Sequence, residues 1–173
     1  MSDNTQGDLS DTRSSRATHS LTEGDLIVGA FNRSAIGTLV ERTSRYTILV
    51  HLPGASRSES LRDQLEVIFE DLPDLLRRSL TWDQGAEMCH HHLLTDATRM
   101  PVFFCNPGRP GQRPSNENTN GLLRNYFPKG TDLRVHTADD LARVANELNR
   151  RPRKTLGWST PHSLFATLRN GSA

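Results

Sequence analysis

Apolar residues gather in short runs from Leu21 onward, and the first three runs are rich in β-branched side chains. They cover residues 25–29, 36–40 and 46–52, which are lengths that suit strands better than helices. The polar segment 41–45 is typical of a hairpin turn between the second and third runs, and Pro53-Gly54 follows the third. The pattern therefore predicts a three-stranded antiparallel meander at the start of the fold.

After Gly54 the pattern alternates between helical and strand-like spacing. Leu61, Leu65 and Phe69 recur on one face at helical spacing, behind Ser58 as a suitable N-cap. We expect helices over residues 58–72, 86–98, 115–126 and 137–149, a short last helix from Thr160-Pro161, and strands over residues 79–82 and 101–105. This order predicts an α/β fold, in which a mixed sheet (the meander plus two further strands) is flanked by helices. It matches the ribonuclease-H-like fold.

The length of 173 residues suits one domain. Residues 1–20 are polar and offer almost nothing to bury, so we expect a disordered tail there, a core over residues 21–169 and a second tail over residues 170–173. No apolar run approaches the roughly 18 residues that span a bilayer. No segment resembles a secretory signal, and two cysteines cannot form a disulfide scaffold. We therefore expect a cytoplasmic protein without a membrane partner.

Charge is distributed unevenly along the chain. Residues 1–98 hold 9 Lys and Arg against 15 Asp and Glu, whereas residues 99–173 hold 12 against 5. A basic C-terminal half indicates a polyanionic partner. A mixed, solvated surface would explain the same counts.

Three carboxylates stand at positions that suit catalysis. We expect Asp25 at the start of the first strand, Asp83 just past the fourth strand, and Glu117 in the first turn of the helix after a loop rich in Pro and Gly. The ends of adjacent strands and a helix start can converge, and crowded carboxylates repel one another unless a cation neutralises them. Oxygen ligands favour Mg²⁺ or Mn²⁺, and two such ions can cleave a phosphodiester. Taken singly, Asp83 also suits a turn and Glu117 a helix start.

Three segments carry a resemblance to a known family: Glu23-Gly-Asp-Leu-Ile-Val-Gly29, Ser79-Leu-Thr-Trp-Asp-Gln-Gly85 and Ser115-Asn-Glu-Asn-Thr-Asn-Gly121. Together they resemble the integrase-type catalytic core of DDE transposases, in the bacterial insertion-sequence group numbered thirty. The 33 residues between Asp83 and Glu117 match the spacing of that group. The resemblance implies catalytic and metal-binding roles for Asp25, Asp83 and Glu117. The implied cofactor is two Mg²⁺ ions, or Mn²⁺ instead, bound by these carboxylates. The implied reaction is metal-dependent hydrolysis of a phosphodiester followed by strand transfer.

The resemblance also implies double-stranded DNA as a partner, at the element ends and at the target, within the nucleoid. Arg124 lies about two helical turns after Glu117 and is expected to hold a phosphate. The other expected DNA contacts are Arg113, Asn118, Lys129, Arg150, Arg153 and Lys154. Because transposition joins two element ends, we expect a homo-oligomer or an assembly with a full-length transposase.

The chain departs from the family at two places. Residues 1–20 show no helix-turn-helix pattern of the kind with which the family recognises element ends, so we expect a truncated copy. The loop before Glu117 holds Asn106, Gly111 and Pro114 where the family tends to hold an acidic residue, an aromatic residue and a glycine. Two alternatives to an active core stay open. One is a catalytically inactive DNA-binding remnant, and the other is a nuclease that hydrolyses DNA with the same triad.

Overall fold

The computed structural model describes residues 21–54, 57–83, 85–106 and 113–171. The predicted tail over residues 1–20 lies outside the described residues, as do positions 107–112 of the loop before Glu117 and the last two residues.

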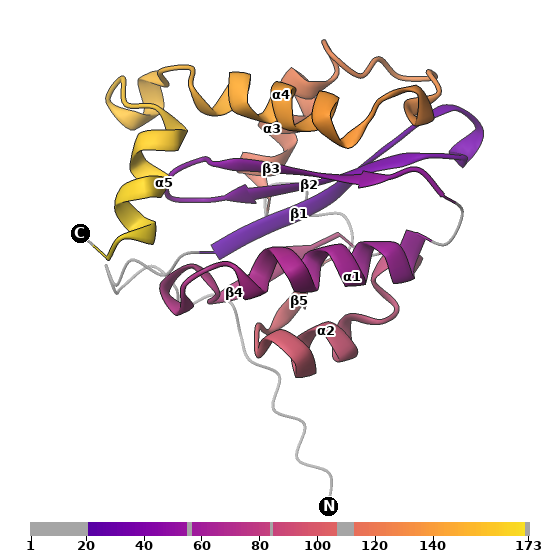
Figure 1. Ribbon diagram of the computed structural model, residues 1–173, viewed down its shortest axis with the longest axis horizontal. Coiled ribbons are helices and arrows are strands. Elements are labelled where there is room, and N and C mark those ends of the chain that lie inside the picture. The colour runs from indigo at the N-terminus through magenta and orange to yellow at the C-terminus, as the bar shows by residue number, and fades with distance from the viewer. Residues whose placement is uncertain (1–20, 55–56, 84, 107–112, 172–173) are drawn as a thin grey trace, which may run out of the picture.

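Five strands form one mixed sheet (Figure 1). They are β1 (Leu21–Val28), β2 (Ala35–Glu41), β3 (Thr47–Leu52), β4 (Ser79–Trp82) and β5 (Val102–Phe104), in the order β3-β2-β1-β4-β5. The first three strands pair antiparallel, whereas β4 runs parallel to both β1 and β5. The predicted meander with two further strands is therefore confirmed.

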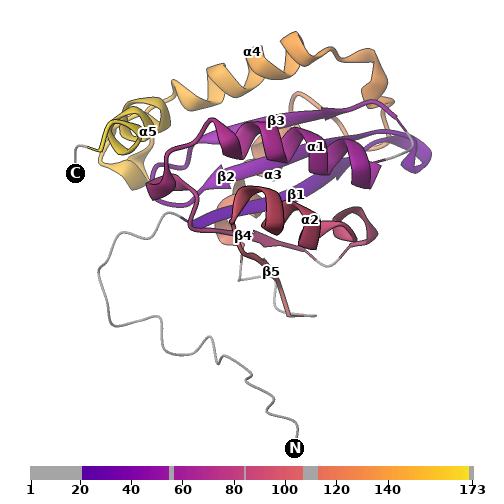
Figure 2. The same ribbon diagram turned by 60° about the horizontal axis from the view of Figure 1, so that its bottom comes forward.

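Helices cover both faces of the sheet (Figures 1 and 2). One face carries α1 (Arg57–Glu70) and α2 (His91–Thr98), and the other carries α3 (Pro114–Leu123) and α4 (Ala138–Asn149). The last helix, α5 (Pro161–Arg169), stacks its Phe165 ring on Tyr46 with centroids 4.1 Å apart. Short 3₁₀ turns cover Ala30–Asn32, Asp74–Leu76, Ala86–Met88, Leu133–Val135 and Lys154–Leu156. None of the helices in the described part of the chain is long and apolar enough to cross a membrane.

Each face of the sheet buries its own apolar cluster. Leu61, Leu65 and Phe69 of α1 pack against the β-sheet with Leu80 and Trp82, as the helical spacing predicted. The second cluster joins the opposite face of the sheet to the helices above it, and its members are Ile27, Ile36, Leu123, Phe127, Leu133, Leu141, Val144 and Leu148. Because apolar side chains pack against both faces of the central strands, these strands are held in a fixed position. Functional side chains on them are therefore held in place as well.

The structure corrects the predicted start of the first strand. It begins at Leu21 rather than Asp25, because residues from Leu21 to Gly24 pair with β4 in the parallel ladder. Asp25 therefore lies within β1, directly after its last β4-paired residue, and not at the strand's start. The polar residues Thr22 and Glu23 obscured this extension in the sequence, although both are buried.

Three predicted helices also have different boundaries. The helix expected over residues 58–72 is α1, which begins at Arg57, so Ser58 lies inside it rather than at its N-cap, and it ends at Glu70. Residues 86–98 form a 3₁₀ turn and then α2, because His90 leaves the helical region at φ −96° and ψ 20°. The helix expected over residues 115–126 starts at Pro114, where proline is favoured as a first helical residue, and ends at Leu123. Glu117 remains in its first turn, as predicted.

Asn116 fastens α3 to the two central strands. Its side chain is fully buried, and its Nδ2 donates to the carbonyl oxygens of Glu23 (3.1 Å) and Thr38 (3.3 Å). The Thr38 hydroxyl donates to Asn116 Oδ1 at 3.0 Å, and the Asn116 backbone N–H donates to Glu23 Oε2 at 2.9 Å. These bonds fix the position of the helix that carries Glu117.

Replacing Asn116 by Ala should destabilise the fold, because it leaves two buried carbonyls and a buried hydroxyl without their partner. We expect the free energy of unfolding in urea to fall by on the order of 2–4 kcal/mol. The exposed neighbour Asn118 is the matched control. Asn118→Ala should change the free energy of unfolding by less than about 0.5 kcal/mol. Equal effects of the two changes would show that the Asn116 contacts do not hold α3.

Candidate active site

Asp25 and Asp83 meet at one edge of the sheet. Gly24 of β1 pairs with Trp82 of β4 at the end of the parallel ladder, so Asp25 and Asp83, the residues that follow them, lie side by side. Asp83 follows β4 directly, as predicted, and its side chain is 52% exposed, whereas that of Asp25 is 25% exposed. Two of the three predicted carboxylates are thus brought together.

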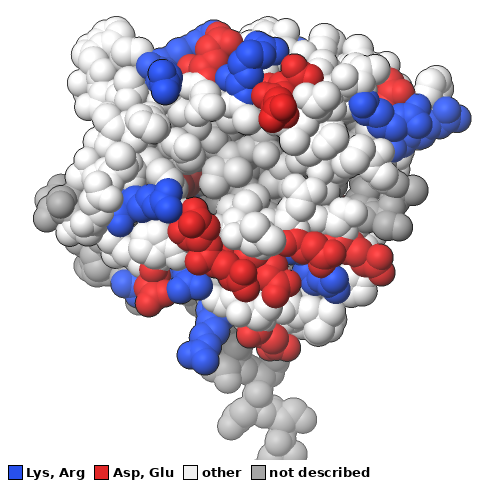
Figure 3. Space-filling model, viewed as in Figure 1, with Lys and Arg blue, Asp and Glu red and all other residues white. Residues whose placement is uncertain are grey.

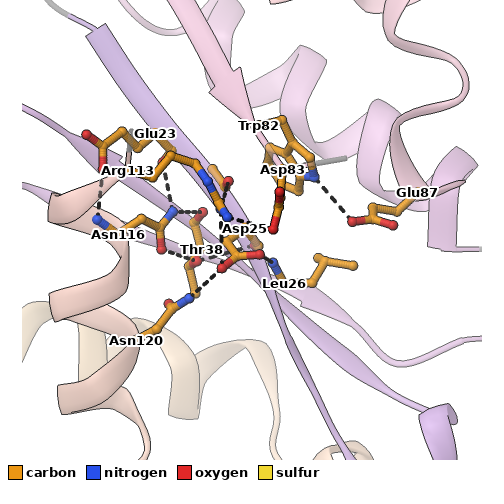
Figure 4. Close-up of polar contacts among 11 residues, drawn as sticks. Glu23, Asp25, Leu26, Thr38, Trp82, Asp83, Glu87, Arg113, Asn116 and Asn120 are labelled. Atoms are coloured by element: carbon orange, nitrogen blue, oxygen red, sulfur yellow. Dashed lines mark hydrogen bonds and ion pairs between the residues drawn. The ribbon is translucent and has the colours of Figure 1, made fainter. Parts of the chain in front are cut away.

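The guanidinium of Arg113 bridges these two carboxylates (Figure 4). Its Nη2 lies 2.7 Å from Asp83 Oδ2, and its Nη1 lies 3.3 Å from Asp25 Oδ2. Nη1 also donates to the Gly24 carbonyl oxygen at 3.1 Å. Burial lowers the pKa of Arg113, but the two carboxylates raise it and the net change is a rise. Arg113 therefore stays charged and serves as the counter-cation of the aspartate pair.

Asp25 sits in a partly buried, fully engaged position. Its Oδ1 accepts from the Leu26 backbone N–H at 2.8 Å, and its Oδ2 accepts from Asn120 Nδ2 at 3.0 Å. Burial raises the pKa of Asp25 and outweighs the opposing attraction of Arg113, while the neighbouring Asp83 adds to the rise. The positive charge beside Asp25 is what permits its ionisation in this setting.

Glu117 does not join the aspartate pair. Its side chain is exposed, and only its backbone is tied to the site, through the N–H that donates to the Arg113 carbonyl oxygen at 3.1 Å. The sheet-facing positions of α3 are taken by Asn116 and Asn120, which lie about one turn apart. Within the described residues, no group of three His, Cys, Asp or Glu side chains lies close enough to hold a metal ion.

The donors at this edge nevertheless suit a hard divalent cation. Asp25 and Asp83 offer carboxylate oxygens and already hold one positive group between them. Asn120 Oδ1 is buried without a hydrogen-bond partner, so an amide oxygen beside Asp25 has unused acceptor capacity. These oxygens are ligands of the kind that Mg²⁺ and Mn²⁺ accept.

Arg124 lies near this site at the C-cap of α3. Its guanidinium donates to the Phe127 carbonyl oxygen at 3.4 Å. Burial lowers the pKa of Arg124, and the attraction of Asp25 opposes this shift. Arg124 is thus a second cation in the field of Asp25.

The remaining predicted DNA-contact residues differ in their availability. Asn118, Lys129, Arg150 and Lys154 are exposed. The side chain of Arg153 is used within the protein, because it donates to the Leu148 carbonyl oxygen at 3.3 Å, and burial lowers its pKa. Arg113 is also used within the protein: its side chain is only 9% exposed, and the two aspartates engage it.

Sequence reasoning missed the polar network behind the site. Glu23 is fully buried at the start of α3, where its Oε1 lies 3.1 Å from Arg42 Nε, and burial raises the pKa of Glu23. Asn116 and Asn120, four residues apart on α3, reach the two central strands. The four-residue spacing of these two asparagines was the only hint in the sequence that one face of α3 is polar and buried. Hydropathy analysis does not detect it, because buried amides do not produce an apolar pattern.

Comparisons with known proteins identify the family of the chain. Residues 15–110 match the family model described as "Integrase core domain". The chain is 50% identical over 144 residues to the transposase for insertion sequence element IS1086 of Cupriavidus metallidurans, covering 83% of this chain and 42% of the relative. It is 51% identical over 143 residues to transposase InsI for insertion sequence element IS30A of Escherichia coli, covering 83% of this chain and 37% of the relative. The chain therefore spans less than half the length of these relatives.

Solved structures share the fold. The catalytic core domain of BIV integrase superposes with a TM-score of 0.64 at 15% identity, covering 88% of this chain and 97% of that one. The chain also superposes, with a TM-score of 0.65 at 18% identity, on a chain of the simian T-cell lymphotropic virus intasome in complex with PP2A regulatory subunit B56 gamma. This match covers 84% of this chain and 54% of that one. These likenesses show the predicted ribonuclease-H-like fold, and the family match with the transposase relatives shows that the chain belongs to the integrase core domain family.

Proposed function

We propose that this chain is the catalytic core of a transposase that cleaves and joins DNA phosphodiesters with the help of divalent metal ions. One observation carries the proposal: two aspartates at the same end of the parallel ladder, Asp25 and Asp83, are both paired with one cationic group, the Arg113 guanidinium. Ionised carboxylates so close together need positive charge, and that charge is what a transferring phosphodiester also needs. The family membership supports the same chemistry.

In the proposed site Asp25 and Asp83 hold Mg²⁺ or Mn²⁺, and Glu117 completes the ligand set for a second ion. When bound, the ions supply an activated nucleophile and stabilise the leaving oxygen. Asn120 orients Asp25 through its 3.0 Å hydrogen bond, and Asn116 fixes the helix that carries Glu117. Arg124 would bind the phosphate next to the scissile bond, because its cationic group already lies in the field of Asp25.

Surface charge favours DNA on the α3 side of the molecule. Acidic side chains form a band along α1 (Figure 3), and they are Glu59, Asp63, Glu66 and Glu70. That band repels a polyanion. Arg124 and the exposed Lys129 follow α3, on the opposite face of the sheet from α1. We therefore propose that duplex DNA approaches the aspartate pair from the side of α3.

The proposed substrates are the element ends and a target duplex, both in the bacterial cytoplasm. Joining two ends requires two active sites, so the proposed partner is a second copy of this chain or a full-length transposase. The relatives are named as transposases of insertion sequence elements, and this chain covers 42% and 37% of the two described above.

One observation favours a second candidate function, a DNA-binding protein without catalysis. Arg113 bridges Asp25 and Asp83, and the side chain of Glu117 is exposed and forms no metal-ligand group with them. If this arrangement persists on DNA, the carboxylates cannot collect metal ions. The chain would then occupy DNA and interfere with an active transposase.

Asp83→Asn should abolish metal-dependent DNA cleavage, because it removes a charged metal ligand and so raises the activation free energy of cleavage by several kcal/mol. We expect cleavage of an end-labelled duplex or branched DNA in Mn²⁺ to fall at least about 100-fold. The exposed Asp139 of α4 is the matched control, and Asp139→Asn should cleave at the wild-type rate.

Three results separate the two candidate functions. Cleavage by the wild type that the Asp83 change abolishes supports the enzyme. DNA retention on a gel without cleavage in Mg²⁺ or Mn²⁺ supports the binding protein. Cleavage that survives the Asp83 change places the chemistry elsewhere and contradicts the proposed site.

Arg113→Gln should make the metal-free protein less stable and more responsive to metal. Without its guanidinium the aspartates repel each other, so we expect the free energy of unfolding in EDTA to fall by on the order of 1–3 kcal/mol. Mn²⁺ should then raise the thermal midpoint more in this variant than in the wild type, because the ion no longer competes with an internal cation.

The matched control for this change is Arg134→Gln. Arg134 forms an ion pair with Asp132 at 2.6 Å on the surface. Loss of this ion pair should lower the free energy of unfolding by less than about 1 kcal/mol. It should leave the effect of Mn²⁺ on the thermal midpoint unchanged. An Arg113→Gln protein that is no more responsive to Mn²⁺ than this control would show that Arg113 does not occupy a metal position.

A further inference from the structure

The hairpin between β1 and β2 projects beyond β4 and β5 at the catalytic edge. Pairing of β1 with β4 ends at Gly24 and Trp82, whereas pairing of β1 with β2 continues to Val28 and Ala35. Val28 lies three residue steps along the strand from Asp25, which corresponds to about 10 Å. The hairpin tip therefore extends past the aspartate pair in the direction in which β4 ends.

The tip holds an aromatic side chain in a strained and exposed position. Phe31 has φ 52° and Asn32 has φ 57°, values that residues other than glycine adopt at a cost. Phe31 is 87% exposed, so it lacks the burial that would offset this strain. Strain of this kind is typical of functional sites.

The backbone beneath Phe31 is firmly held. Gly29 N–H donates to the Ser34 carbonyl oxygen at 2.9 Å, and Ala30 N–H donates to the Thr131 carbonyl oxygen at 2.7 Å. A Cβ on Gly29 would lie 2.5 Å from Ser34 Oγ and 2.9 Å from the Thr131 oxygen, so the two segments approach as closely as glycine permits. Figure 1 shows the hairpin beside the segment that follows α3. The aromatic ring is thus presented on a rigid support.

An arginine lies against the ring, and a lysine lies on the neighbouring segment. The Arg33 Cζ lies 5.4 Å from the centroid of the Phe31 ring, a cation–π distance. The exposed Lys129 belongs to the segment that Thr131 ties to the hairpin. An aromatic face beside arginine and lysine is the arrangement that binds unpaired nucleotides, through base stacking and phosphate contacts.

We propose that Phe31 stacks on an unpaired or frayed DNA base at least about three nucleotides from the phosphate at the aspartate pair. The spacing follows from the 10 Å of strand between Asp25 and Val28 and a rise of about 3.4 Å per nucleotide. The proposal rests on the proposed function, because it assumes that DNA lies at the catalytic edge. It adds a base contact on the β1–β2 hairpin. The DNA contacts predicted from the sequence lie instead at the start of α3, on α3 and in the segments after it.

Anisotropy with a forked duplex tests this contact. The single-stranded arm carries 2-aminopurine, whose fluorescence falls on stacking. Phe31→Ala and Phe31→Gly should weaken binding of the fork at least about five-fold and abolish the quenching. Phe31→Trp should retain both, and binding of a fully paired duplex should change less than about two-fold in all three variants.

Two controls separate base stacking from a structural role. Glycine adopts φ 52° without strain, so Phe31→Gly should be at least as stable as the wild type while it loses fork binding. Val135, a 72% exposed apolar residue of the neighbouring segment, is the matched control, and Val135→Ala should bind the fork like the wild type.

The outcomes distinguish this proposal from the proposed function. Wild-type binding of duplex and fork with no effect of Phe31→Ala overturns the stacking contact alone. A wild type that binds neither DNA overturns both. A Phe31→Ala protein that keeps fork binding but changes its molar mass in light scattering overturns stacking in favour of a contact between copies of the chain.

Discussion

The parallel pairing of β1 with β4 imposes the constraint on which the site depends. It sets Asp25 and Asp83 side by side at the edge where both strands leave their common ladder. Two carboxylates so placed repel each other, and a cation between them relieves that repulsion. Arg113 supplies that cation in this structure, at 3.3 Å and 2.7 Å from the two side chains. The same electrostatic demand makes the edge suitable for the divalent ion that we propose there.

A buried polar network transmits this constraint to α3. Glu23 precedes Asp25 by two residues on β1, accepts the Asn116 N–H, and so fixes the start of the helix. Asn120 then reaches Asp25 from the next turn. The helix is thereby held by the strand that carries the first aspartate, and the backbone of Glu117 is placed next to Arg113. Any movement of Arg113 upon metal binding would act directly on the first turn of α3, where Glu117 and Arg113 are joined through the backbone.

The fold was predictable from the sequence to the extent that it depends on hydropathy. The β-branched runs and the Leu61, Leu65 and Phe69 stripe predicted the meander and α1, and the positions of Asp83 and Glu117 followed from strand and helix boundaries. The buried Glu23 and Asn116 were not predictable, because polar residues inside the core have no periodic signal and depend on partners distant in sequence. The left-handed conformation of Phe31 was hidden for a related reason, since such turns are expected at glycine.

The most direct measurement of the proposed metal site is anomalous diffraction at the manganese edge from crystals of the wild-type chain grown with Mn²⁺. A metal site at the sheet edge predicts an anomalous peak within coordination distance of Asp25 and Asp83, with the Arg113 guanidinium moved away from both carboxylates. A map with no peak at this edge, and with Arg113 still bridging the two aspartates at saturating Mn²⁺, would contradict the proposed metal-dependent chemistry.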